Sequence, residues 1–97
     1  MFYAKKHYTK GEIVVAICDE ELLGKWIKGK DVKIYVDKKF YGDKVIDERI
    51  AIEMLKEATI ANLLGRKIVE LAVSNGFIEK KFIMLIGDVP HAQLVKI

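Results

Sequence analysis

The sequence has one cysteine, Cys18, and lacks any apolar run that approaches the ~20 residues of a membrane-spanning helix. A single cysteine excludes a disulfide within the chain and argues against a zinc site, which usually combines several cysteines and histidines. The first seven residues also lack the basic-then-apolar order of a signal peptide. We therefore expect a cytoplasmic protein with no membrane partner.

Recognisable phosphate and metal motifs are missing as well. Gly24-Lys25 and Gly65-Arg66 lack the surrounding pattern of a P-loop or dinucleotide-binding turn. The acids Asp19-Glu20-Glu21 are adjacent in the chain and no histidine is near them, so we expect neither a metal nor a cofactor. Internal repeats and Pro/Ser-rich linkers are also lacking, and the length suits one domain over residues 1–97.

The formal net charge of +3 resides in the first half of the chain. Residues 1–46 hold ten lysines and seven acids, whereas residues 47–97 hold seven basic and seven acidic residues. Seven of the nine aromatic residues also lie in the first half. Ammonium groups can meet phosphates while aromatic rings stack on bases, so this composition predicts an RNA-binding face. Its candidate residues are Lys25, Lys28, Lys30, Lys33, Lys38 and Lys39 for phosphates, with Trp26 and Tyr41 for stacking.

The lysines also permit a structural interpretation. Fifteen lysines with few amides resemble the composition of thermophile proteins, and lysine keeps edge strands from pairing with neighbours. Trp26 could likewise be a core anchor in so small a domain. Only two arginines are present, which argues against sequence-specific reading of bases through bidentate contacts.

The first part of the chain is expected to be rich in strands. Residues 12–18 are apolar on both faces, which predicts a central strand covered on both sides. Asp19 is expected to cap a short helical turn over residues 20–23. Further predictions are strands over residues 2–8 and 32–36, the latter burying Val32, Ile34 and Val36, a turn at 28–31, and an end to this part at Gly42-Asp43.

The middle of the chain is expected to be helical and the end to return to strands. Asp47 is the predicted N-cap of a helix that continues to an interruption at Gly65, and a second helix follows until Asn75-Gly76. Residues 82–86 are the most apolar run and predict another central strand. A turn over residues 87–91 then leads to a last strand over 93–97. The fold class is therefore α+β, a mainly antiparallel or mixed sheet with two main helices, in the order β-β-(short α)-β-α-α-β-β.

Four stretches together resemble the archaeal domain of unknown function 424 family over nearly the whole chain. They are residues 18–25 (CDEELLGK), 40–42 (FYG), 58–65 (ATIANLLG) and 86–93 (IGDVPHAQ). The resemblance implies a small cytoplasmic archaeal protein of unassigned activity, with a link to translation. It carries over no catalytic residues, although Cys18 and His91 fall within the matching stretches.

Several polar residues are candidates for chemistry. Cys18 precedes a helical turn, where the pKa of a thiol can be lowered, and His91 would be its base; the alternative for Cys18 is a small buried hydrophobe. Asn62, His91 and Gln93 are candidate ligand-binding residues, or they only satisfy backbone groups in their surroundings. An enzyme or ligand binder built on these side chains requires all four to converge in one pocket.

Three functions follow from these patterns. We expect first a non-enzymatic binding module that contacts ribosomal or other structured RNA, or a ribonucleoprotein, through the lysine-rich face. The second is a protein-interaction module, including a homo-oligomer or a partner from the translation apparatus, that uses sheet edges or the Pro90-His91 turn. The third is a small enzyme or ligand binder that uses Cys18 and His91.

Overall fold

The computed structural model describes residues 1–42 and 44–97. Its strands are β1 (Phe2–Thr9), β2 (Glu12–Asp19), β3 (Trp26–Lys28), β4 (Lys33–Tyr35), β5 (Lys44–Ile46), β6 (Ile60–Leu64), β7 (Met84–Ile86) and β8 (Val89–Val95). Its helices are α1 (Lys38–Tyr41), α2 (Glu48–Glu57) and α3 (Arg66–Ser74), with 3₁₀ turns at Glu20–Leu22 and Lys80–Phe82. The predicted end at Gly42-Asp43 falls partly outside the described residues, because Asp43 is not among them.

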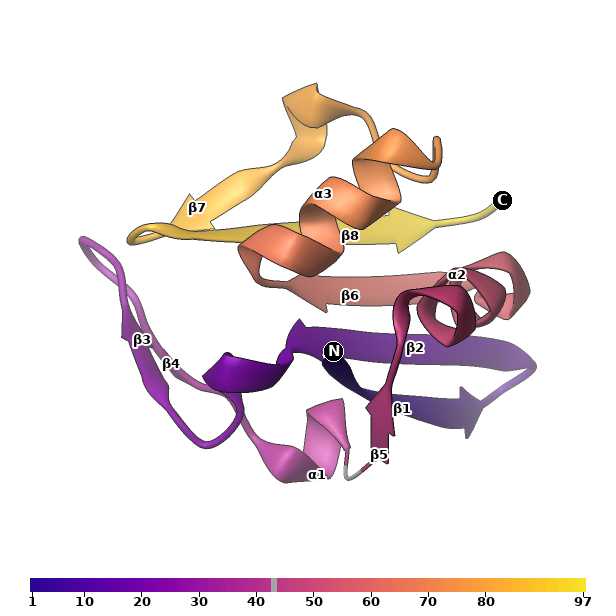
Figure 1. Cartoon of the computed structure of the whole chain (residues 1–97), viewed down its shortest axis with the longest axis horizontal. Coiled ribbons are helices and arrows are strands. Elements are labelled where there is room, and N and C mark those ends of the chain that lie inside the picture. The colour runs from indigo at the N-terminus through magenta and orange to yellow at the C-terminus, as the bar shows by residue number, and fades with distance from the viewer. Residues whose placement is uncertain (43) are drawn as a thin grey trace.

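Six of the strands form one mixed sheet in the order β5-β1-β2-β6-β8-β7, and β3 and β4 form a separate hairpin (Figure 1). Neighbouring strands are antiparallel except β2 and β6, which are parallel and are connected through α2. The predicted α+β class and mixed sheet are confirmed. Both β3 and the short β5 were missing from the predicted order.

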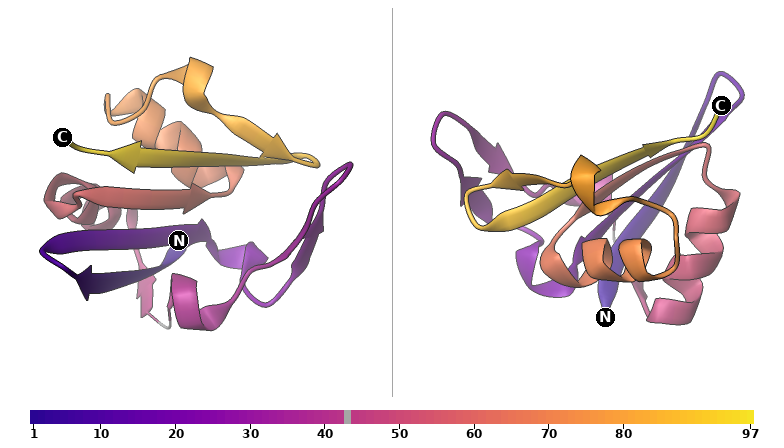
Figure 2. Two further views of the ribbon diagram at one scale, coloured as in Figure 1. Left: turned by 180° about the vertical axis from the view of Figure 1, so that it is seen from behind. Right: turned by 90° about the horizontal axis from the view of Figure 1, so that it is seen from above.

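β2 lies in the middle of the sheet and is covered on both faces, as predicted. Val15 and Ile17 belong to the core beneath α2 and α3, whereas Ala16 and Cys18 belong to a second core on the opposite face. That second core is closed by residues of the β3–β4 hairpin and of the α1 region. Seen from behind, this covering lies at one end of the sheet, and the rest of the face carries no helix (Figure 2).

Residues 60–64 form a strand, so the predicted helix that reaches Gly65 is wrong. α2 begins at its expected cap, where the Asp47 side chain accepts from the Ile50 N–H, but it ends at Glu57. The following segment pairs with β2 on one side and β8 on the other. Ala61 and Leu63 are fully buried in the core beneath the helices and Leu64 in the second core, whereas Ile60 and Asn62 are half-buried. Asn62 is its only polar side chain, so the segment has no polar face from which sequence periodicity could distinguish strand from helix.

The run 82–86 is not a central strand. β7 lies at the edge of the sheet, and the side chains of Met84 and Leu85 are 68% and 66% exposed. The turn that follows is confined to Gly87-Asp88, so Pro90 and His91 lie inside β8 and not in a turn. Val32 is 51% exposed rather than buried, because the strand begins one residue later, at Lys33.

Asp19 caps a different helix from the one predicted. Its side chain makes no capping hydrogen bond to the turn Glu20–Leu22. The carboxylate instead accepts from the backbone N–H groups of Lys67 and Ile68, both at 2.9 Å, at the start of α3. α3 ends at Asn75-Gly76 as expected, with Gly76 at a φ of 78°.

Candidate nucleic-acid interface

The β3–β4 hairpin presents one polar and aromatic face and one apolar face. Its register places Trp26 opposite Tyr35 and Lys28 opposite Lys33. Side chains alternate along a strand, so these four residues share one face, which we call the arm face. The central pair of the hairpin, Ile27 and Ile34, points the other way into the second core. The alternation of apolar and polar residues therefore anchors the hairpin and leaves the arm face in solvent.

Two exposed aromatic rings form the centre of the arm face. The rings of Trp26 and Tyr35 lie 5.2 Å apart between centroids and are tilted by 48°. Trp26 is 59% exposed, so it is not the core anchor that composition allowed. The Lys33 ammonium lies 4.7 Å from the centre of the Trp26 ring, a cation–π contact at the protein surface. Flat π surfaces and positive charge therefore occur together here.

The six lysines predicted for phosphate contacts are all exposed. Four lie on or beside the hairpin and two on α1: Lys25, Lys28, Lys30, Lys33, Lys38 and Lys39. Within residues 1–42 and 44–97, none of the six lies within 4.0 Å of a carboxylate oxygen in an ion pair. These ammonium groups can therefore meet a phosphate without breaking an ion pair among the described residues, and only that of Lys33 would have to leave the Trp26 ring.

Tyr41 was chosen wrongly as the second stacking residue. It is 8% exposed and lies in the second core, where burial raises the pKa of its phenol to about 12. Sequence reasoning missed Tyr35, which is 45% exposed. The alternation through Lys33, Ile34 and Tyr35 indicated that the Tyr35 ring points outward. Its pairing with Trp26 could not be predicted, because the strand β3 was not predicted.

The tip of the hairpin rests on the β7–β8 turn. The Gly29 N–H donates to the Val32 carbonyl oxygen at 2.6 Å and closes the hairpin. Gly87 has a φ of 61°, and a Cβ at this position would collide with the Lys28 carbonyl oxygen. The backbones approach so closely that only glycine fits, and the contact holds the arm against the sheet.

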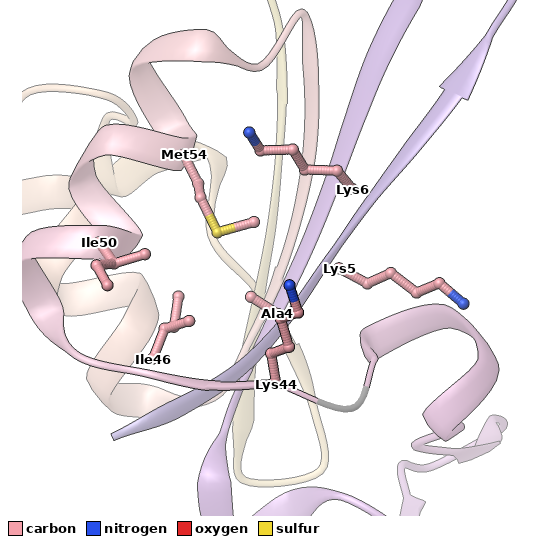
Figure 3. Close-up of a pocket in the computed structure, with 7 residues that line it drawn as sticks. All are labelled: Ala4, Lys5, Lys6, Lys44, Ile46, Ile50 and Met54. Atoms are coloured by element: carbon pink, nitrogen blue, oxygen red, sulfur yellow. The ribbon is translucent and has the colours of Figure 1, made fainter.

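A pocket of about 430 Å³ between β1, β5 and α2 is a second lysine-lined candidate for phosphate binding (Figure 3). Its lining contains three lysines and four apolar residues: Ala4, Lys5, Lys6, Lys44, Ile46, Ile50 and Met54. Lys5 and Lys6 diverge, however. The Lys5 ammonium donates to the Lys39 carbonyl oxygen at 3.1 Å, and Lys6 forms an ion pair with Glu57. Two of the three amines are therefore engaged within the protein, which makes the pocket a poorer phosphate site than the arm face.

The four residues proposed for an enzyme or ligand site share one face of the sheet. Cys18 and His91 flank Leu64 in adjacent strands, and Asn62 lies beside Gln93. Cys18 and His91 are two strands apart, roughly 9–10 Å, which is too far for proton transfer between them. Cys18 is fully buried, and burial raises the pKa of its thiol to about 12.

The other polar candidates of this group have partners or little solvent. The Gln93 side-chain N–H donates to the Asn62 side-chain oxygen at 2.8 Å, so each amide satisfies the other in part. His91 is half-buried, and burial lowers the pKa of its imidazole. Across the described part of the chain, no cluster of three or more potential metal ligands is found. The described helices also include none that is long and apolar enough to cross a membrane.

Comparisons with known proteins agree with this fold. The chain belongs to the family described as protein of unknown function (DUF424), whose model matches residues 7–97. Among solved structures, it is similar to the crystal structure of an uncharacterized conserved protein from Methanopyrus kandleri. That similarity has a TM-score of 0.81 and 29% sequence identity, and covers 99% of this chain and 94% of that chain. A comparison with curated proteins found no match. The predicted family resemblance is confirmed.

Proposed function

We propose that this family member is a non-enzymatic RNA-binding module whose arm face contacts ribosomal or other structured RNA. One observation carries the proposal: the exposed Trp26–Tyr35 pair lies on the same hairpin face as Lys28 and Lys33. Lys25 and Lys30 extend the positive charge along the arm, and Lys38 and Lys39 extend it onto α1.

The arm face supports a particular mode of binding. An unpaired base that stacks on Trp26 would contribute ~1–3 kcal/mol, regardless of its identity. The lysines would neutralise phosphates and release counterions, which makes the affinity depend on salt. Lysine lacks the bidentate fork of arginine, so little discrimination between bases is expected. The favoured target is consequently a loop or single-stranded segment within a folded RNA.

Trp26 is the only tryptophan, so its fluorescence reports directly on the arm face. Titration of nucleic-acid-free protein with an RNA hairpin that has an unpaired loop should quench this fluorescence. If four lysines each neutralise one phosphate, the slope of log K against log salt is about −3, and a fivefold rise in salt weakens binding by roughly 90-fold. No quenching and no binding at about 50 mM salt, or binding that ignores the fivefold increase, would overturn the proposal.

The C-terminal half offers matched controls. Phe82 is also 59% exposed, and the Lys81 ammonium lies 5.3 Å from its ring centre. Trp26→Ala should weaken RNA binding roughly 5- to 160-fold, whereas Phe82→Ala should leave it unchanged. Filter binding measures both variants, since the tryptophan signal is lost in the first.

Charge reversal gives a second matched pair. Lys28→Glu with Lys33→Glu changes the net charge as much as Lys80→Glu with Lys81→Glu, and all four lysines are exposed. The arm variant should lose most of the affinity and about 1.4 units of salt slope, whereas the control should keep both. Equal losses in the two double variants would mean that only overall charge matters, and the assignment to the arm face would be wrong.

A further inference from the structure

One edge strand of the sheet carries neither a charged residue nor a proline. β7 is its outermost strand, with Met84 and Leu85 about two-thirds exposed and no charge between Met84 and Ile86. The opposite edge strand, β5, carries Lys44. Natural edge strands commonly carry lysine or proline because an apolar edge with free backbone groups recruits another strand. β7 therefore has the character of a pairing edge.

The backbone of Leu85 is directed outward at this edge. The Pro90 carbonyl oxygen accepts from the Gly65 N–H, so the backbone of Pro90 is turned toward β6. Leu85 lies opposite Pro90 in the antiparallel pair β7–β8. Hydrogen-bonded and non-hydrogen-bonded pairs alternate in such a ladder, which leaves the N–H and C=O of Leu85 pointing away from β8. A strand added at this edge would be centred on Leu85.

We propose that β7 pairs antiparallel with β7 of a second copy of this chain, about a two-fold axis at Leu85. In this register Leu85 meets its own equivalent and Met84 meets Ile86 of the second copy, so the pairing spans the three residues of β7. Two six-stranded sheets would thereby become continuous. The interface is self-complementary and uses the β7 edge of each copy, so association through this edge closes at a dimer.

The charges beside β7 fit this orientation. Lys80 and Lys81 precede the strand and Asp88 follows it, and all three are exposed. Antiparallel pairing brings Asp88 of each copy close to Lys81 of the other, whereas parallel pairing would place like charges together. Lys81 also lies 3.5 Å from Glu79, but that exposed pair contributes little and does not compete strongly. The two ends of β7 are therefore complementary in charge across the proposed two-fold axis.

Light scattering on nucleic-acid-free protein tests the dimer over about 5–500 µM, because association depends on protomer concentration. The mass should rise from 11.1 kDa toward twice that value. Leu85→Lys should hold it at the monomer value, at least about tenfold weaker in association, through repulsion across the axis. Val45→Lys, on the opposite edge, is the matched control and should dimerise like the wild type. A monomer at every concentration, normal dimerisation of Leu85→Lys, or equal loss in Val45→Lys would overturn the proposal.

Charge exchange tests the antiparallel register separately. Asp88→Lys alone and Lys81→Asp alone should each weaken the dimer, because each places like charges opposite one another. The combined variant should restore most of the association, since the two charges are exchanged in both copies. Because all these positions are exposed, circular dichroism should show an intact fold in every variant. If the combined variant dimerises even more weakly than either single variant, the antiparallel register is wrong.

Discussion

Replacing Asp19 by alanine is expected to destabilise the protein more than removing an exposed helix cap. Asp19 is 4% exposed and accepts two backbone hydrogen bonds of 2.9 Å at the start of α3. Asp47 caps α2 with one bond of 2.9 Å, to the Ile50 N–H, and is exposed. Water can replace the Asp47 side chain but has little access to the Ile68 N–H. The two caps therefore differ in burial more than in chemistry.

The burial and hydrogen bonds of Asp19 determine how much unfolding free energy Asp19→Ala should lose. Loss of an exposed cap costs about 1 kcal/mol. Loss of Asp19 leaves two donors, one buried and one partly buried, and an unsatisfied buried group costs about 1–3 kcal/mol. Burial raises the pKa of Asp19, so part of that cost is offset when the carboxylate is removed. A net loss of about 2–4 kcal/mol remains for Asp19→Ala, which corresponds to a fall in Tm of roughly 10–25 °C in a domain of this size.

Urea and thermal unfolding of Asp19→Ala, Asp19→Asn and Asp47→Ala give the comparison. Asp19→Asn keeps one carbonyl acceptor of similar shape, so its loss of unfolding free energy should fall between the other two. A cost for Asp19→Ala equal to or below that of Asp47→Ala would refute the reasoning, because burial would then add nothing to the cap.

Three further outcomes are expected. The Cys18 thiol, buried and with its pKa raised to about 12, should resist a thiol reagent in the native protein at neutral pH and react once urea unfolds it; rapid native labelling would contradict its enclosure. Gly87→Ala should displace the arm and lower RNA affinity more than Gly11→Ala does, since a Cβ at Gly11 meets nothing within 4 Å. Because the pKa of Asp19 is raised in the fold above 3.8, its ionisation disfavours folding. The stability of the wild type relative to Asp19→Asn should therefore fall as the pH rises from 3.8 through the raised pKa of the folded protein. A rise in relative stability over the same pH range would contradict the raised pKa.

The parts of the fold predicted well from sequence are those with local signals. The Asp47 cap, the Asn75-Gly76 end of α3 and the buried stretch of β2 each depend on neighbouring residues, and all were confirmed. β6 and β7 lacked such signals. The run 82–86 is apolar throughout and β6 is apolar except for Asn62, yet β6 lies between two strands and β7 lies exposed at the edge. Whether an apolar run is central is decided by its distant partners, which sequence periodicity does not contain.

The candidate site divides in the same way. Exposure of the lysines was predicted because a charged side chain favours water, whereas for Trp26 the sequence left both a core position and an exposed stacking role open. Tyr35 and Tyr41 could not be ranked, since one ring points outward from β4 and the other is enclosed by a core that forms only when α1 packs on the sheet. Asp19 was assigned to the nearest turn, whereas its true partners lie 48 and 49 residues later. Each error reflects a long-range contact.

The contacts among the family stretches bear on what membership in the family implies. Asp19 fills the space beside Gly65, where a Cβ would collide with the carboxylate, and the Gly65 N–H donates to the Pro90 carbonyl oxygen. These three residues come from separate matching stretches, and their contacts fix the start of α3 against the sheet. The residues of β3 and β4 lie outside all four stretches. These contacts belong to the scaffold, whereas the proposed RNA binding would depend on the rings and lysines of the arm in this chain. A relative with the same scaffold but without an aromatic pair at the equivalents of Trp26 and Tyr35 should fold alike and lack base stacking.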